Sequence, residues 1–285
     1  MKAFVTTVAG IAVLGLSLLT GCASGPPPVH PPVTAEAKAK GVSAVRSAVL
    51  DKTDHMTVHL DDAREVLYVQ TFGNSAAVGV LFGPLGVLAN IANTKAVTEA
   101  DQARLMNKIP VRASQAFSEA VAEAGLALGS TRTEGGVNLS PYLYFVKLGD
   151  GKVLAASALV VEAPTPGALL PQARYLYQHS RGYTIDELSM ATPETVAEIN
   201  KQLRAGYVEL IRFYLSDKSE AMSAEKLVKY KSDFLSPRFD FEGGGRIAAE
   251  TAERIWIRNI FGVAAVLRPN ITVVGPWELA QAPSN

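Results

Sequence analysis

Cys22 is the only cysteine among the 285 residues of this chain, and this fact constrains the fold most. No disulfide can form within the chain, so a stable fold has to be held by a buried apolar core. Hydrophobic residues make up 48% of the sequence, which is ample for such a core. Cys22 lies just after an apolar N-terminal run, and this position also bears on how the chain is targeted.

Residues 1–21 have the outline of a secretory signal, with Lys2 near the start and an apolar run from Ala9 to Leu19. The run is shorter than the roughly 20 residues that a membrane span needs, although an uncleaved anchor remains the alternative. Leu19-Thr20-Gly21-Cys22 resembles the lipobox of bacterial lipoproteins. The resemblance implies a signal peptide over 1–21 and a lipidated Cys22 that begins the mature chain. It also implies retention at the outer membrane on the periplasmic side, because Ala23 rather than Asp follows the cysteine.

Charge argues against nucleic acid as a partner. Removing residues 1–21 takes away only Lys2, which leaves 26 basic and 27 acidic side chains. A near-neutral chain lacks the electrostatic footprint of a nucleic-acid-binding protein. The lipobox resemblance instead implies the membrane, through Cys22, as one partner, and we expect an envelope protein or cell-wall component as the other.

The mature chain divides into three parts by pattern. Residues 22–41 contain a run of prolines and predict an extended tether. Residues 42–218 predict an α+β domain, with strand-like runs such as 65–72 and a hairpin signal at Gly149-Asp150-Gly151. Amphipathic helices are expected within 94–129, ending at Gly129, and within 192–216, with Thr192 as the N-cap and Pro193 at the first helical position. The second of these helices should bury an apolar stripe that includes Ile199, Leu203 and Tyr207. We expect an antiparallel sheet with the helices packed on it, an order of elements similar to the small domains of curli-secretion and penicillin-binding-protein-activator lipoproteins.

Residues 219–285 predict a small all-β domain, because short strand-like runs follow one another closely between glycine- and proline-rich turns. Ile255-Trp256-Ile257-Arg258 and the run from Gly262 to Ile271, which contains Pro269-Asn270, resemble the closing strands of SH3-like barrels. The resemblance implies an SH3-like fold for this block and no particular ligand.

An uncharged stretch from Val66 to Thr94 is the least ordinary part of the mature chain. Residues 73–92 predict a Gly-rich apolar hairpin around Gly83-Pro84, buried in the core. Two short helices, a membrane-interfacial element or a partner-binding patch are the alternatives. The stretch is too short and too interrupted for a clean membrane span.

Catalytic and metal-binding patterns are weak. His55 and His59 are four residues apart, but Met56 stands where a metalloprotease motif needs glutamate, so they form only a weak metal candidate. Gly73-Asn74-Ser75 resembles half of a nucleophile elbow, with His179 as the available downstream histidine. No cofactor motif is present in the sequence, and we expect a protein that is not an enzyme.

Tyrosines offer a possible binding face. Tyr142 and Tyr144 alternate along one strand-like run, and Tyr175 and Tyr177 alternate along another. Tyrosine combines apolar area with a polar tip, which suits contacts with glycans or peptides, although half-buried packing is the alternative. With the lipobox resemblance, we expect an outer-membrane lipoprotein that binds or scaffolds in the cell envelope. An assembly or transport factor that uses residues 73–92, and less so a periplasmic hydrolase, are the other hypotheses.

Overall fold

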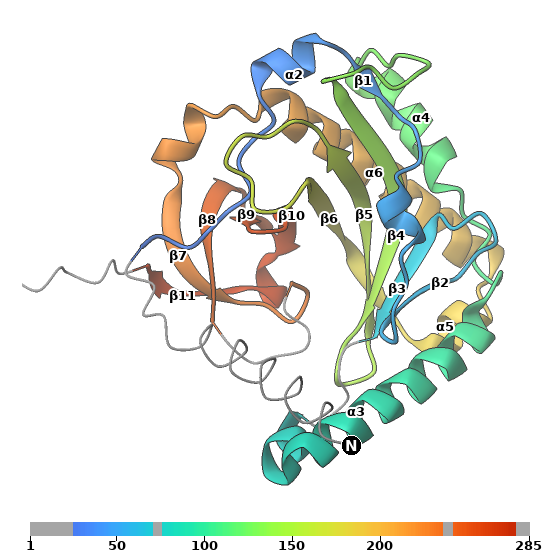
Figure 1. Cartoon of the computed structure of the whole chain (residues 1–285). Helices are drawn as coiled ribbons and strands as arrows, with labels where there is room; N and C mark the ends of the chain where they lie inside the picture. Colours follow the sequence, from blue (N-terminus) through green and yellow to red (C-terminus); the bar gives the residue numbers. More distant parts are fainter. Residues whose placement is uncertain (1–24, 71–75, 236–241, 278–285) are drawn as a thin grey trace, which may run out of the picture.

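A computed structural model of the chain describes residues 25–70, 76–235 and 242–277, and for residues 76–90 it gives only the course of the backbone. The fold is α+β, a large mixed sheet with helices packed on one face (Figure 1). Its helices and 3-10 turns are α2 (Ala35–Ala39), η1 (Ala48–Asp51), α3 (Ala76–Leu105), α4 (Ala113–Ala124), α5 (Ile185–Ser189), α6 (Pro193–Ser216), η2 (Ala221–Ala224) and η3 (Arg268–Asn270). Its strands are β1 (Val42–Ser43), β2 (Thr57–His59), β3 (Val66–Gln70), β4 (Val137–Lys147), β5 (Val153–Glu162), β6 (Gln172–Tyr183), β7 (Lys226–Lys231), β8 (Gly243–Glu250), β9 (Arg254–Asn259), β10 (Gly262–Leu267) and β11 (Thr272–Pro276).

The eleven strands of the described chain belong to one sheet, in the order β11-β7-β8-β9-β10-β6-β5-β4-β3-β2, with β1 beside β4. The prediction of an antiparallel sheet is wrong in part, because β3 with β4, β6 with β10 and β1 with β4 pair in parallel. The physical reason is the long crossovers: α3 and α4 separate β3 from β4, and α6 with three strands separates β6 from β10.

Helices α4 and α6 cover one face of β4, β5 and β6, and the main core lies between them and the sheet (Figure 1). The predicted stripe of α6 is buried there, including Ile199, Leu203 and Tyr207. As predicted, Thr192 caps this helix by accepting from the Thr195 N–H, and Pro193 opens it. The helix end predicted at Gly129 is wrong: α4 stops at Gly125, which adopts a left-handed φ of 69°.

The hairpin predicted over 73–92 is wrong from Ala76 onward, where the chain forms the start of helix α3; residues 73–75 lie outside the described residues. The hairpin prediction requires a turn at Gly83-Pro84, but helix α3 continues through it. A helix pairs the backbone N–H and C=O groups of the stretch within itself, so no partner strand is needed. The other end of α3 is held by Asp101, whose Oδ2 accepts from Tyr68 at 2.6 Å and from Lys147 at 2.7 Å. Among the described helices, none combines the length and apolar character needed to cross a bilayer.

The tether predicted over 22–41 is wrong for its described part, because residues 25–41 lie against the folded body. Val33 and Ala37 are buried in the main core. The N–H of His30 donates to the Asn259 carbonyl oxygen at 2.8 Å, at the end of β9. Composition favours an extended chain here, but composition does not reveal that its apolar side chains find partners. We call residues 25–41 the strap.

Residues 42–218 and 219–285 share the sheet through the parallel pairing of β6 with β10. At the junction Gly262 has φ of 132°, and a Cβ there would lie 2.3 Å from the Arg174 carbonyl oxygen. Only glycine tolerates both the backbone conformation and this close approach. This junction brings residues 42–218 and 219–285 together, and both parts line one cavity.

Candidate functional site

A cavity of about 650 Å³ lies on the face of the sheet opposite α4 and α6. Strands β3, β4, β5 and β6 line it, together with the segment around η1 on one side and residues 234–235 and 259–264 on the other. Its walls are mainly apolar, with Leu67, Val69, Leu176 and Phe234 among them. Cavities of this size and character are typical of small-molecule sites.

The predicted tyrosine face divides between the two faces of the sheet. Tyr142 and Tyr144 line the cavity, with their rings edge-on at 6.4 Å. Tyr175 belongs to the core beneath the helices, and Tyr177 packs beside the same core. The two tyrosines of each pair share a strand face, as predicted. The two pairs lie on opposite faces of the sheet, because Tyr142 is paired with Ala158 and Tyr177 with Ser157. Ala158 and Ser157 are neighbours on β5, so their side chains point to opposite faces. Of these four tyrosines, Tyr142 and Tyr144 are the two that line the cavity and can contact a ligand there.

Two basic side chains give the cavity its electrostatic character. Lys52 and Arg174 are exposed lining residues, and neither forms an ion pair or side-chain hydrogen bond within the described residues. Burial raises the pKa of Tyr142 to about 12, while the nearby Arg174 acts in the opposite direction. Asp54, the acidic lining residue, accepts from the Met56 N–H at 2.7 Å. The cavity is therefore mainly apolar, and its lining includes two cations that have no ion-pair partner among the described residues.

Phe261 adds an apolar lip to the cavity. The residue sits in the turn between β9 and β10, and its side chain is 55% exposed although it contributes to the lining. An exposed phenylalanine beside a largely apolar cavity extends the surface that an apolar ligand can cover. No sequence pattern singles out Lys52, Arg174 or Phe261, because nothing local shows that the three will share one cavity.

The metal candidate gains no support from the positions of its residues. His59 lies on β2, and burial followed by the charge of Arg46 lowers its pKa. His55 precedes that strand in irregular chain. Among the described residues no group of three histidine, cysteine, aspartate or glutamate side chains is placed to hold a metal ion.

The serine-hydrolase candidate cannot be placed, because Ser75 lies outside the described residues. A different serine–histidine pair does exist: Ser157 Oγ lies 3.0 Å from His179 Nε2, and both residues are buried. The Ser157 hydroxyl donates to the Leu203 carbonyl oxygen at 2.8 Å, so its oxygen accepts from a proton on Nε2. A histidine in that tautomer cannot take the serine proton. Burial lowers the pKa of His179 to about 3, as expected for a neutral core histidine.

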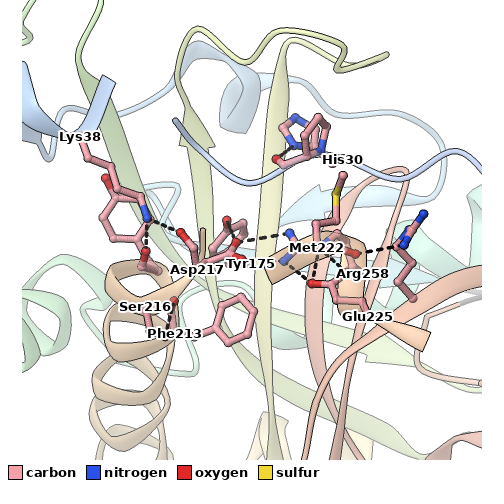
Figure 2. Close-up of polar contacts among 12 residues, drawn as sticks. His30, Lys38, Tyr175, Phe213, Ser216, Asp217, Met222, Glu225 and Arg258 are labelled. Atoms are coloured by element: carbon pink, nitrogen blue, oxygen red, sulfur yellow. Dashed lines mark hydrogen bonds and ion pairs between the residues drawn. The ribbon is translucent and has the colours of Figure 1, made fainter. Parts of the chain in front are cut away.

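A buried charge network lies beside the strap (Figure 2). Arg258, only 1% exposed, donates to Asp217 Oδ1 at 2.6 Å and to Glu225 Oε1 at 2.9 Å. Burial acts to lower the pKa of Arg258, but the carboxylates of Glu225 and Asp217 raise it overall. The Tyr175 hydroxyl donates to Asp217 Oδ2 at 3.0 Å. Within the described chain these groups pair with one another, so the network ties the end of α6 to β9.

Lys38 joins the strap to this network. Its Nζ donates to the carbonyl oxygens of Tyr214 at 2.5 Å and Asp217 at 2.7 Å, at the C-terminal end of α6 (Figure 2). A cation at this end of a helix interacts favourably with the last carbonyl groups. His30, drawn in Figure 2 above Arg258, belongs to the same strap.

The predicted lipidation residue, Cys22, lies outside the described residues. Comparison with known proteins adds no further residue: no protein family, no curated protein and no solved structure matches the chain.

Proposed function

We propose that this chain is a lipid-anchored binding protein of the bacterial cell envelope, held at the outer membrane by Cys22 and facing the periplasm. The observation that carries the binding role is the largely apolar cavity of about 650 Å³ beneath Tyr142 and Tyr144. The binding role requires no catalysis, and the buried Ser157–His179 pair offers none.

The chemistry of the cavity favours an anionic amphiphile, such as an acyl chain with an acidic head group. Leu176 and Phe234 provide apolar contact for the chain, and burial of each methylene contributes about 0.8 kcal/mol. Lys52 and Arg174 provide positive charge for the head group, and both are without an ion-pair partner in the described chain. A neutral glycan would leave these cations unused and the apolar walls without contact.

We also propose that strands β7–β11 form a small barrel of the SH3-like kind. The order β11-β7-β8-β9-β10 places the last strand beside the first, which is how a five-stranded unit begins to close on itself. The 3-10 turn η3, with Pro269 and Asn270, joins β10 to β11 in support of this proposal. Phe234, Asn259 and Phe261 belong to this unit and line the cavity, so it acts as one wall of the site.

Titration with a fluorescent fatty acid, 11-(dansylamino)undecanoic acid, tests the binding role. We expect saturable binding at one site per chain. Arg174→Gln should weaken it roughly fivefold, the effect of losing a partly exposed ion pair of about 1 kcal/mol, and Phe261→Ser should weaken it through lost apolar contact. Lys201→Gln is the matched control, because Lys201 is exposed on α6 and does not line the cavity. Equal binding by Arg174→Gln, Phe261→Ser and the control would refute the proposed site.

A further inference from the structure

The strap fixes the place where an anchored chain would leave the folded body. The Trp277 Nε1–H donates to the Gly25 carbonyl oxygen at 3.1 Å, which holds the first described residue at the end of β11. Pro27 is buried, and a Cβ on Gly244 of β8 would lie 2.5 Å from Pro27 and 2.6 Å from the Trp277 ring. The beginning of the strap is therefore packed tightly against β8 and the residue that follows β11.

Only Ala23 and Ser24 separate Gly25 from Cys22. An extended chain covers at most about 3.6 Å per residue, so Cys22 lies within about 11 Å of Gly25. Lipid attached to Cys22 would thus hold the sheet edge formed by β7 and β11 directly at the bilayer. A free 20-residue tether would instead allow the domain to be tens of Å away.

The side chains at this edge suit a lipid surface. β11 is the last strand of the sheet, and it exposes Val273 (37%) and Val274 (47%). Sheet edges of soluble proteins rarely present apolar side chains without a cover, because such edges associate with other strands. Trp277 follows β11, and indole rings are enriched at the level of lipid head groups.

The neighbouring strand β7 contributes positive charge. Lys226 and Lys229 lie on this six-residue strand, which carries no acidic residue. Lysine attracts anionic head groups, and its long stem can lie along apolar surface while the ammonium stays in water. The strands β7 and β11, with Trp277, thus bring lysine, valine and tryptophan side chains to the edge of the sheet where the anchor leaves the fold.

We infer that the edge formed by β7 and β11 lies on the phospholipid surface that carries the acyl chains of Cys22. This inference rests on the proposed lipid anchor and deepens it, because it states which face of the protein the membrane covers. The contact is shallow: Val273, Val274 and Trp277 reach the head-group region while the backbone of the β11 edge stays hydrated. The bilayer rather than a second copy is the expected cover, because the chain between Cys22 and Gly25 is too short to hold this edge away from it.

Fluorescence quenching on the full-length lipidated protein tests this orientation. Acylation of Cys22 blocks the only native thiol, so a cysteine introduced by Val274→Cys can be labelled alone with an environment-sensitive dye. Met190→Cys is the control, since Met190 is 72% exposed and directly follows α5, a helix that lies well away from β11 (Figure 1). Both proteins are placed in vesicles of phosphatidylethanolamine and phosphatidylglycerol, and quenching by a water-soluble nitroxide is compared with quenching by a nitroxide-labelled lipid.

The expected result is that the label at position 274 loses quenching from water and gains quenching from lipid, while the label at 190 does neither. Equal quenching of the two labels, with palmitate present on Cys22, would overturn the inference and leave the proposed anchor intact. Absence of palmitate from Cys22 would instead refute the anchor, and the inference with it. Shielding of position 274 that depends on protein concentration without vesicles would overturn the inference in favour of a second copy at this edge.

Discussion

Shortening one buried side chain of the strap should destabilise the whole domain. Val33 is 2% exposed and belongs to the core that α4 and α6 share with the sheet. Val33→Ala removes two methyl groups, which corresponds to about 1.6 kcal/mol of lost burial at about 0.8 kcal/mol per group. The cavity left behind adds to this cost, so we expect a loss of about 2 kcal/mol in the free energy of unfolding. That is roughly a 30-fold change in the unfolding equilibrium.

The assay is urea unfolding of the soluble chain that begins after Cys22, followed by circular dichroism. Val33→Ala should lower the midpoint while leaving the slope of free energy against urea unchanged, because the same surface becomes exposed. The matched control is Val45→Ala, the same substitution at a side chain that is 41% exposed, with an expected change within about 0.5 kcal/mol. If the two variants unfold at the same urea concentration, Val33 and the strap do not contribute to the core.

Three further predictions concern the charge network, a core histidine and the sheet junction. Arg258→Met should lower the free energy of unfolding in urea by about 3–5 kcal/mol, because it leaves two buried carboxylates unpaired. Arg212→Met, which removes an exposed ion pair, should lower it by less than about 1 kcal/mol. Burial holds the pKa of His179 at about 3, below the 6.5 of the unfolded chain. The contribution of neutral His179 to the free energy of unfolding should therefore be fully present above pH 6.5. Stability should then fall toward pH 3 by up to about 1.4 kcal/mol per pH unit, and a pH series in which His179→Gln keeps the wild-type slope would refute this. Gly262→Ala should lower the free energy of unfolding, measured by thermal unfolding, by at least about 2 kcal/mol. The control is Gly275→Ala, where no atom lies within 4 Å of the new Cβ. An equal effect of the two substitutions would contradict the close approach at Gly262.

Local features of the fold follow from the sequence because neighbouring residues determine them. Thr192 and Pro193 indicate the start of α6, and the spacing of the apolar residues that follow predicts its buried face. Gly149–Gly151 likewise indicates the turn between β4 and β5. The start of α3 was not predicted, because an uncharged run with Gly83-Pro84 is compatible with a hairpin or a helix, and only tertiary context decides between them.

The site depends on pairings that are distant in sequence, and this is why little of it was predicted. Arg174 and Phe261 share the cavity only because β10 pairs with β6 across the whole of α6 and three strands. The alternation of Tyr142 and Tyr144 was readable, but the face that each strand presents depends on the register of its neighbours. The strap was misjudged for a similar reason, since a proline-rich segment has the same composition whether it is free or packed.

Protection of the His30 backbone amide from hydrogen exchange tests the central claim, that the strap belongs to the fold and brings an anchored domain onto the membrane. This N–H donates to the Asn259 carbonyl oxygen at 2.8 Å and lies in the middle of the proline-rich segment. In the native soluble chain we expect it to exchange slowly, with an opening free energy comparable to that of amides in β9. Exchange at the rate of an unstructured peptide would contradict the account, because residues 25–41 would then be the free tether that their composition suggests.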